Sequence, residues 1–82
     1  GGGTSAEIPQ IRTAVGEKLV DVLVRGDVFP SKSEARRMIQ QGGLTLNDVR
    51  VADEQYILGE GDFTDGAALI KKGKKKHYRL VY

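Results

Sequence analysis

The sequence contains no cysteine and no tryptophan, and it has a single histidine among 82 residues. The lack of cysteine excludes disulfides and thiolate metal sites, and it fits a reducing compartment such as the cytoplasm. No hydrophobic run approaches the length of a membrane span, and no segment has the pattern of a signal peptide. We therefore expect one small domain without membrane contact, burying about 60% of the surface of its unfolded chain.

Residues that could support catalysis are also scarce. The one histidine, His77, has no acidic residue near it in the sequence, so a general-base role would need a partner brought by folding. Ser31 and Ser33 are better suited to capping a helix and to donating to phosphate than to nucleophilic attack. There is no Gly-x-x-x-x-Gly-Lys phosphate loop and no cluster of metal ligands. We expect that this chain is not an enzyme by itself and holds no cofactor or metal.

The charges are unevenly distributed along the chain. Lysine and arginine total 13 against 11 acids, which gives a formal net charge of only +2. Residues 52–70 contain five acids and no lysine or arginine, whereas residues 71–82 contain six basic residues and no acid. A polyanion would meet this local basic patch. A solubilising turn would also suit lysines, but five within six positions exceed what solubility needs. An anionic membrane would explain only the lysines, since no amphipathic anchor accompanies them. An RNA surface would explain both the lysines and the pair Arg36 and Arg37, so we favour RNA.

Residues 30–43 read PSKSEARRMIQQGG and predict a short helix. Ser31 and Glu34 have the spacing of a capping box, in which each side chain bonds the backbone amide of the other residue. Pro30 ends the previous segment, and the pair Gly42-Gly43 supplies a left-handed residue that ends a helix. A helix of about three turns fits between them.

The two faces of this predicted helix differ in chemistry. At about 100° per residue, Ala35, Met38 and Ile39 form one apolar stripe, which must dock because so short a helix is marginal alone. The opposite face is polar and consists of Lys32, Ser33, Arg36, Arg37 and Gln40. Cations and hydroxyls beside the positive end of the helix dipole match phosphate, although a merely solvated face is the alternative.

The rest of the chain suggests a mixed fold. Within residues 17–25, an almost continuous apolar run does not let spacing alone distinguish a helix from a strand; it consists of Leu19, Val20, Val22, Leu23 and Val24. Residues 44–51 predict a hairpin with Asn47 and Asp48 in its turn. Residues 53–66 predict a loop that holds Tyr56, Ile57 and Leu58 against the core.

The two ends of the chain complete this interpretation. Residues 68–71 and 77–81 predict a second hairpin around a turn at residues 72–74. Residues 1–9 are glycine-rich at their start and predict a flexible linker or an expression tail, which leaves residues 10–82 as the domain.

The predicted helix and the hairpin after it resemble a known RNA-binding motif. The helix opening Ser-x-Ser-x-Ala-Arg, ending at Gly-Gly and followed by a hairpin, is typical of the domain named after ribosomal protein S four. The residues that match this signature are Ser31, Ser33, Ala35, Arg36, Gly42 and Gly43. The segments at residues 7–9 and 45–47 and the Lys-Gly-Lys-Lys-Lys turn extend the resemblance to the C-terminal domain of bacterial-type tyrosyl-tRNA synthetases.

The resemblance implies a fold and a function. The fold would be α+β, with two packed helices against a small, mainly antiparallel sheet, and residues 17–25 would form the first helix and pack on Met38 and Ile39. The domain would grip the anticodon stem and long variable arm of the tRNA for tyrosine. The expected RNA-binding residues are Lys32, Ser33, Arg36, Arg37, Lys71, Lys72, Lys74, Lys75 and Lys76.

The resemblance also implies a parent protein, a homodimeric ligase that uses ATP and magnesium. Its chemistry would lie in a separate domain with His-Ile-Gly-His and Lys-Met-Ser-Lys-Ser type motifs, which this chain lacks. The chain would then be a monomeric, cytoplasmic binding fragment. Asp48 departs from the family at a position where a turn glycine is common, and so do Gln40 and Gln41 at positions where a basic residue often occurs. The alternatives are the same RNA-binding module in another RNA-processing or ribosome-associated protein, and a basic module that docks an acidic protein.

Overall fold

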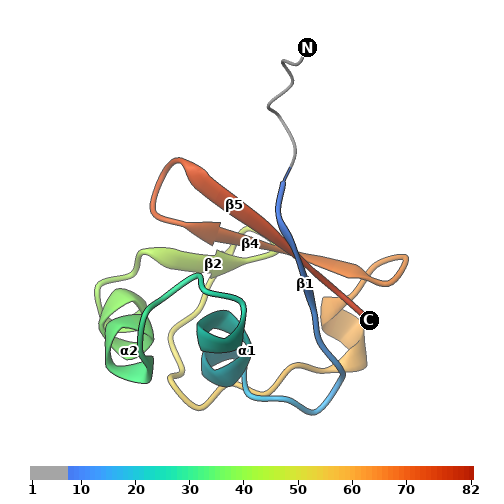
Figure 1. The fold of residues 1–82 in the computed structure, drawn as a ribbon, viewed down its shortest axis with the longest axis horizontal. Helices are drawn as coiled ribbons and strands as arrows, with labels where there is room; N and C mark the ends of the chain where they lie inside the picture. The colour runs from blue at the N-terminus through green and yellow to red at the C-terminus, as the bar shows by residue number, and fades with distance from the viewer. Residues whose placement is uncertain (1–7) are drawn as a thin grey trace.

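Two helices pack on one face of a five-stranded sheet (Figure 1). The structure, a computed structural model, describes residues 8–82, so most of the predicted tail at residues 1–9 lies outside the described part. The elements follow in the order β1 (Gln10–Arg12), α1 (Leu19–Arg25), α2 (Lys32–Gln40), β2 (Leu44–Leu46), β3 (Val49–Arg50), the 3-10 helix η2 (Glu60–Asp62), β4 (Ala67–Lys72) and β5 (Lys76–Val81).

The sheet has the strand order β1-β5-β4-β2-β3. All neighbouring strands are antiparallel except β1 and β5, which run parallel with Ile11 opposite Leu80. The predicted α+β fold, with two helices against a mainly antiparallel sheet, is confirmed. The second hairpin has longer strands than predicted, because pairing continues to Lys72 opposite Lys76, and its turn is residues 73–75.

The core lies between the helices and the sheet. Ala35 and Ile39 of α2 are buried as predicted, and Met38 packs against the core as a partly buried side chain. In α1, the buried residues are Leu19, Val20, Val22 and Leu23. At about 100° per residue these four positions fall on one broad face of a helix, while Asp21 and Arg25 stay at least partly accessible, so the apolar run is buried as a single helical face. The sheet contributes the buried side chains Leu44, Leu46, Ile70 and Leu80.

The first helix begins at Leu19, so Glu17 is not part of it, contrary to the prediction for residues 17–25. The helix ends at Gly26, where an added Cβ would lie 2.7 Å from Cδ1 of Ile11. Because real side chains do not approach so closely, only glycine lets β1 pack directly on the end of α1.

The acidic segment after β3 contains a further correction. Leu58 is buried and Tyr56 packs against the core, but Ile57 is 55% exposed instead of held against the core. Ile57 pairs with Lys18 in an isolated antiparallel bridge, and alternation along extended backbone turns its side chain outward while Leu58 turns inward. Phe63, which was not singled out from the sequence, is buried and contacts Tyr82 edge-on at 4.7 Å between ring centroids. Neither helix of the described part is long and apolar enough to cross a membrane.

Candidate nucleic-acid interface

The helix α2 begins as the sequence predicts, but with half of the expected capping box. Ser31 has extended backbone, and its Oγ accepts a hydrogen bond from the Glu34 amide at 3.3 Å. The reciprocal bond from the Ser31 amide to the Glu34 carboxylate is absent among residues 8–82. Glu34 Oε2 lies instead 3.7 Å from Nη1 of Arg37. The helix ends at Gln40, and Gly42, two residues farther on, has the expected left-handed conformation with a φ of +75°.

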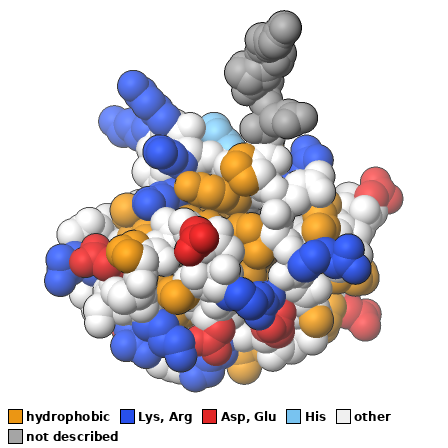
Figure 2. Space-filling model, in the orientation of Figure 1, with side chains coloured by type: hydrophobic (Ala, Val, Ile, Leu, Met, Phe, Trp, Pro, Cys, Tyr) orange, Lys and Arg blue, Asp and Glu red, His pale blue; other side chains and the backbone are white. Residues whose placement is uncertain are grey.

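The polar face of α2 has the predicted composition but a mixed charge. Lys32, Ser33 and Arg37 are exposed and Arg36 is half-buried. Lys32 Nζ lies 3.0 Å from a carboxylate oxygen of Asp21, and Arg37 has Glu34 beside it. In Figure 2 the surface at the α2 side of the molecule accordingly carries both positive and negative side chains. These exposed ion pairs are weak, so phosphate can compete for both cations.

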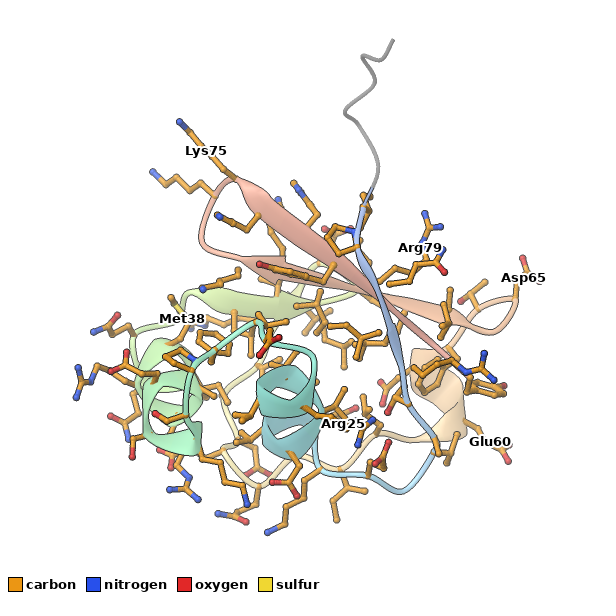
Figure 3. All side chains as sticks on the ribbon, in the orientation of Figure 1. Arg25, Met38, Glu60, Asp65, Lys75 and Arg79 are labelled. Carbon is orange, nitrogen blue, oxygen red and sulfur yellow. The ribbon has the colours of Figure 1, made fainter. Side chains whose placement is uncertain are left out.

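The turn between β4 and β5 is more uniformly positive. Lys74, Lys75 and Lys76 are exposed, and none of them is in an ion pair of the described structure. Figure 2 shows positive side chains gathered where this hairpin ends, and Lys75 projects away from the body of the protein in Figure 3. We call Lys74, Lys75 and Lys76 the lysine turn.

Lys72, also predicted as an RNA contact, has another role. Its Nζ donates a hydrogen bond to the Val28 carbonyl at 2.8 Å and lies 4.7 Å from the centroid of the Phe29 ring. Both partners belong to the connection between α1 and α2. The Gly73 amide also donates to the Gly43 carbonyl at 2.7 Å, just beyond the C-terminal end of α2. These contacts fasten the lysine turn beside the two ends of α2, so the two predicted basic elements are neighbours.

Strand register separates Lys71 from the other lysines. Lys71 lies opposite Thr45 on one side and His77 on the other, and these residues alternate with the buried Ile70 and Leu46. Side chains of successive strand residues point to opposite faces. Lys71 therefore belongs to the face of the sheet away from the helices, whereas Lys72 and Lys76 belong to the helix side.

Two further exposed cations, Arg12 and Arg79, were not predicted as site residues. They also lie at positions facing away from the helices, next to the inward-facing Ile11 and Leu80. The alternation of β5 is a signal that could have found Arg79. The position of Arg12 on this face follows only from the parallel pairing of β1 with β5, which joins the two ends of the domain.

One charged pair, between Glu17 and Arg25, lies outside the α2 face and the lysine turn. Glu17 accepts two hydrogen bonds from the Arg25 guanidinium, at 2.7 and 3.0 Å, and further bonds from Thr13 Oγ1 and the Ala14 amide. The bonds from Arg25 and Thr13 lower the pKa of Glu17 to about 2. Arg25 also donates to the Arg12 carbonyl at 2.7 Å, so this cation is used to join the end of β1 to α1.

Residues 8–82 contain no group of three or more histidine, cysteine, aspartate or glutamate side chains arranged to hold a metal ion. The arrangement instead offers ammonium, guanidinium and hydroxyl groups on exposed surfaces. Such groups donate to phosphate oxygens, which are the commonest contacts between proteins and nucleic acids.

Comparison with known proteins identifies the family. The family model described as the tyrosine–tRNA ligase SYY-like C-terminal domain matches residues 3–81. The chain belongs to this family. Membership confirms the resemblance to the C-terminal domain of tyrosyl-tRNA synthetases that the sequence analysis identified.

Individual relatives of the SYY-like C-terminal domain agree with the family match. The chain is 44% identical to tyrosine–tRNA ligase 1 of Clostridium acetobutylicum and 45% identical to the tyrosine–tRNA ligase of Caldanaerobacter subterraneus subsp. tengcongensis, in each case over 99% of the chain. It is 42% identical to the tyrosine–tRNA ligase of Clostridium beijerinckii over 98% of the chain. The chain spans only 21% of the length of the first two relatives and 20% of the third.

Proposed function

We propose that this chain is the tRNA-binding domain of a tyrosine–tRNA ligase and that it contributes binding, not chemistry, to aminoacylation. The observation that carries the proposal is the lysine turn. Three exposed lysines free of ion pairs in the described structure are fastened beside α2 by the contacts of Lys72 and Gly73. Family membership supports the choice of tRNA among polyanions.

The contacts with RNA would be made mainly to its backbone. The lysine turn supplies ammonium groups, which act as point charges for phosphate. The face of α2 adds Lys32 and the Ser33 hydroxyl in the first turn, where the helix dipole also favours an anion, and the cations Arg36 and Arg37 farther along the helix. Recognition would then depend mainly on the shape of the RNA.

The resemblance extends the proposal to the parent protein. There the RNA segments would be the anticodon stem and the long variable arm of the tRNA for tyrosine. The parent would be a cytoplasmic homodimer that uses ATP and magnesium in a separate catalytic domain. This chain alone would be a monomer without a cofactor.

The proposal is tested by fluorescence anisotropy with the 82-residue chain. The probes are labelled tRNA for tyrosine and an unrelated tRNA with a short variable arm, and the competitor is polyglutamate. We expect the tRNA for tyrosine to bind more tightly than the unrelated tRNA and to resist polyglutamate. Equal affinity for both tRNAs would indicate an RNA-binding module of another protein class. Displacement of RNA by polyglutamate at equal charge concentration would indicate a module that docks acidic proteins.

A further inference from the structure

The face of the sheet opposite the helices is uncovered by any helix of the described part (Figure 1). In β4 and β5, Ala68, Ile70 and Leu80 are buried against the helices. The residues between them face the other way, and several remain half-buried or exposed. An antiparallel sheet commonly leaves one face in water. A mixture of positively and negatively charged side chains is enough to solvate such a face.

The charged side chains on this uncovered face in β1, β4 and β5 are all cations. They are Arg12 in β1, Lys71 in β4 and Arg79 in β5, and the imidazole of His77 lies opposite Lys71. No outward-facing position in β1, β2, β4 or β5 is an aspartate or glutamate. In a chain with 13 basic and 11 acidic residues, this one-sided distribution is not the mixture that solubility alone would give.

These cations are also available to a partner. Arg12 and Arg79 are exposed, and neither they nor Lys71 form an ion pair within residues 8–82. In Figure 3 the Arg79 side chain points away from the helices. The row in which Lys71 pairs with His77 lies next to the pair of Lys72 and Lys76, so the face runs directly into the lysine turn.

We propose that this sheet face, formed by Arg12, Lys71, His77 and Arg79, is a second RNA-binding surface that contacts phosphates. The inference rests on the proposed function and adds to it a surface outside the face of α2 and the lysine turn. Because the sheet separates the two surfaces, they contact different nucleotides. The lysine turn lies at their shared edge, and Lys71 belongs to the sheet face.

The test compares charge-removing variants in the 82-residue chain. Arg79→Gln and the double variant Arg12→Gln/Arg79→Gln remove cations of the sheet face. Lys18→Gln is the matched control, because Lys18 is an exposed cation that bonds the Gln55 side chain at the start of α1, away from both surfaces. Arg36→Gln/Arg37→Gln removes cations of the α2 face. Thermal melting by circular dichroism checks that each variant folds. If the double variant is unstable, the RNA-binding result is taken from Arg79→Gln alone, because Arg79 is exposed and its replacement does not disturb the core.

Binding to the tRNA for tyrosine is measured as a function of salt, with hydroxyl-radical footprinting of the bound RNA. Each lost phosphate contact should flatten the slope of log affinity against log salt by about 0.7 to 0.9. We therefore expect a change of about one for Arg79→Gln, about two for the double variant, and none for Lys18→Gln. Arg12→Gln/Arg79→Gln should lose protection at nucleotides that Arg36→Gln/Arg37→Gln still protects.

The inference is overturned if the sheet variants keep the slope and footprint of Lys18→Gln, or if both double variants lose the same protections. It is also overturned if the sheet variant loses affinity for polyglutamate but not for tRNA, because the face would then bind acidic protein. Failure of the proposed function is a different result, in which the unmodified chain does not prefer tRNA over polyglutamate.

Discussion

The ammonium group of Lys72 lies between a carbonyl and an aromatic ring, donating to Val28 O at 2.8 Å and lying 4.7 Å from the centroid of Phe29. This contact joins β4 to the connection between α1 and α2. Lys72 is therefore part of the fold, although it belongs to the same run of lysines as the exposed lysine turn. Replacing Lys72 should therefore affect stability, whereas replacing residues of the lysine turn should affect RNA binding.

Replacing Lys72 by alanine should reduce stability. The variant loses a hydrogen bond and a cation–π contact and leaves the Val28 carbonyl without this donor, which together cost about 1–2 kcal/mol. Urea unfolding measures this loss. Lys75→Ala is the control, because its side chain projects into solvent: we expect unchanged stability and weaker tRNA binding at low salt. Equal stability of the two variants would contradict the role assigned to Lys72.

The two faces of α2 should also respond differently to substitution. Ile39 is buried and packs in the core, so Ile39→Ala should destabilise the protein by roughly 2–5 kcal/mol. Arg37→Ala removes an exposed cation and should weaken tRNA binding with little change in melting temperature. Equal tRNA affinity of Arg36→Ala, Arg37→Ala and the unmodified chain would remove α2 from the RNA-binding surface.

The start of α2 provides a test of the half-formed capping box. Ser31→Ala removes the acceptor for the Glu34 amide and should cost about 1 kcal/mol of stability. Glu34→Gln should cost only a few tenths of a kcal/mol, through the helix dipole, since its carboxylate does not bond the Ser31 amide. Chemical denaturation of both variants checks this, and equal losses would show that the complete box forms.

Glu17 should make stability depend on acidic pH. Its pKa in the folded protein is about 2, below the ordinary value of 4.5. Its contribution is therefore fully present above about pH 4.5 and is lost as the pH falls from there towards 2. Because Glu17 and Arg25 have side chains 32% and 49% exposed, solvent screens the pair, and we expect Glu17→Gln to cost only about 1 kcal/mol at pH 7.

Unfolding of Glu17→Gln and the unmodified chain at several pH values separates this contribution from those of other carboxylates. The difference in stability between the two proteins should shrink between pH 4.5 and pH 2. A difference that stays constant over this range would show that Glu17 acts through packing alone.

The parts of the fold that the sequence predicted correctly are those with local determinants. Ser31, Gly42 and the apolar stripe of α2 act within one helix, and the hairpin turn at Asn47 and Asp48 has the positive φ angles, 53° and 68°, that these residues tolerate. In contrast, α1 was ambiguous because a helix buried on most sides and a buried strand have the same apolar pattern. The resemblance, not the spacing, led to the correct assignment.

The parts that the sequence did not predict depend on contacts between distant residues. Ile57 is exposed because its extended backbone pairs with the distant Lys18, which turns Leu58 inward. The Glu17 carboxylate binds Thr13 and Arg25, so Glu17 joins the segment before α1 to the end of that helix. The same holds for the candidate site. The run of lysines is visible in the sequence, but only the register of β4 and β5 shows that Lys71 and Lys72 lie on opposite faces.

The central claim, that the lysine turn binds RNA phosphates, is tested most directly by a salt series on Lys74→Ala/Lys75→Ala/Lys76→Ala and the unmodified chain. With about five phosphates engaged, log affinity for the tRNA for tyrosine should fall against log salt with a slope of roughly −3 to −5. The triple variant should flatten that slope by about two to three units, because each lysine would lose one phosphate contact. An unchanged slope would contradict the claim and reduce the lysine turn to a solvated loop.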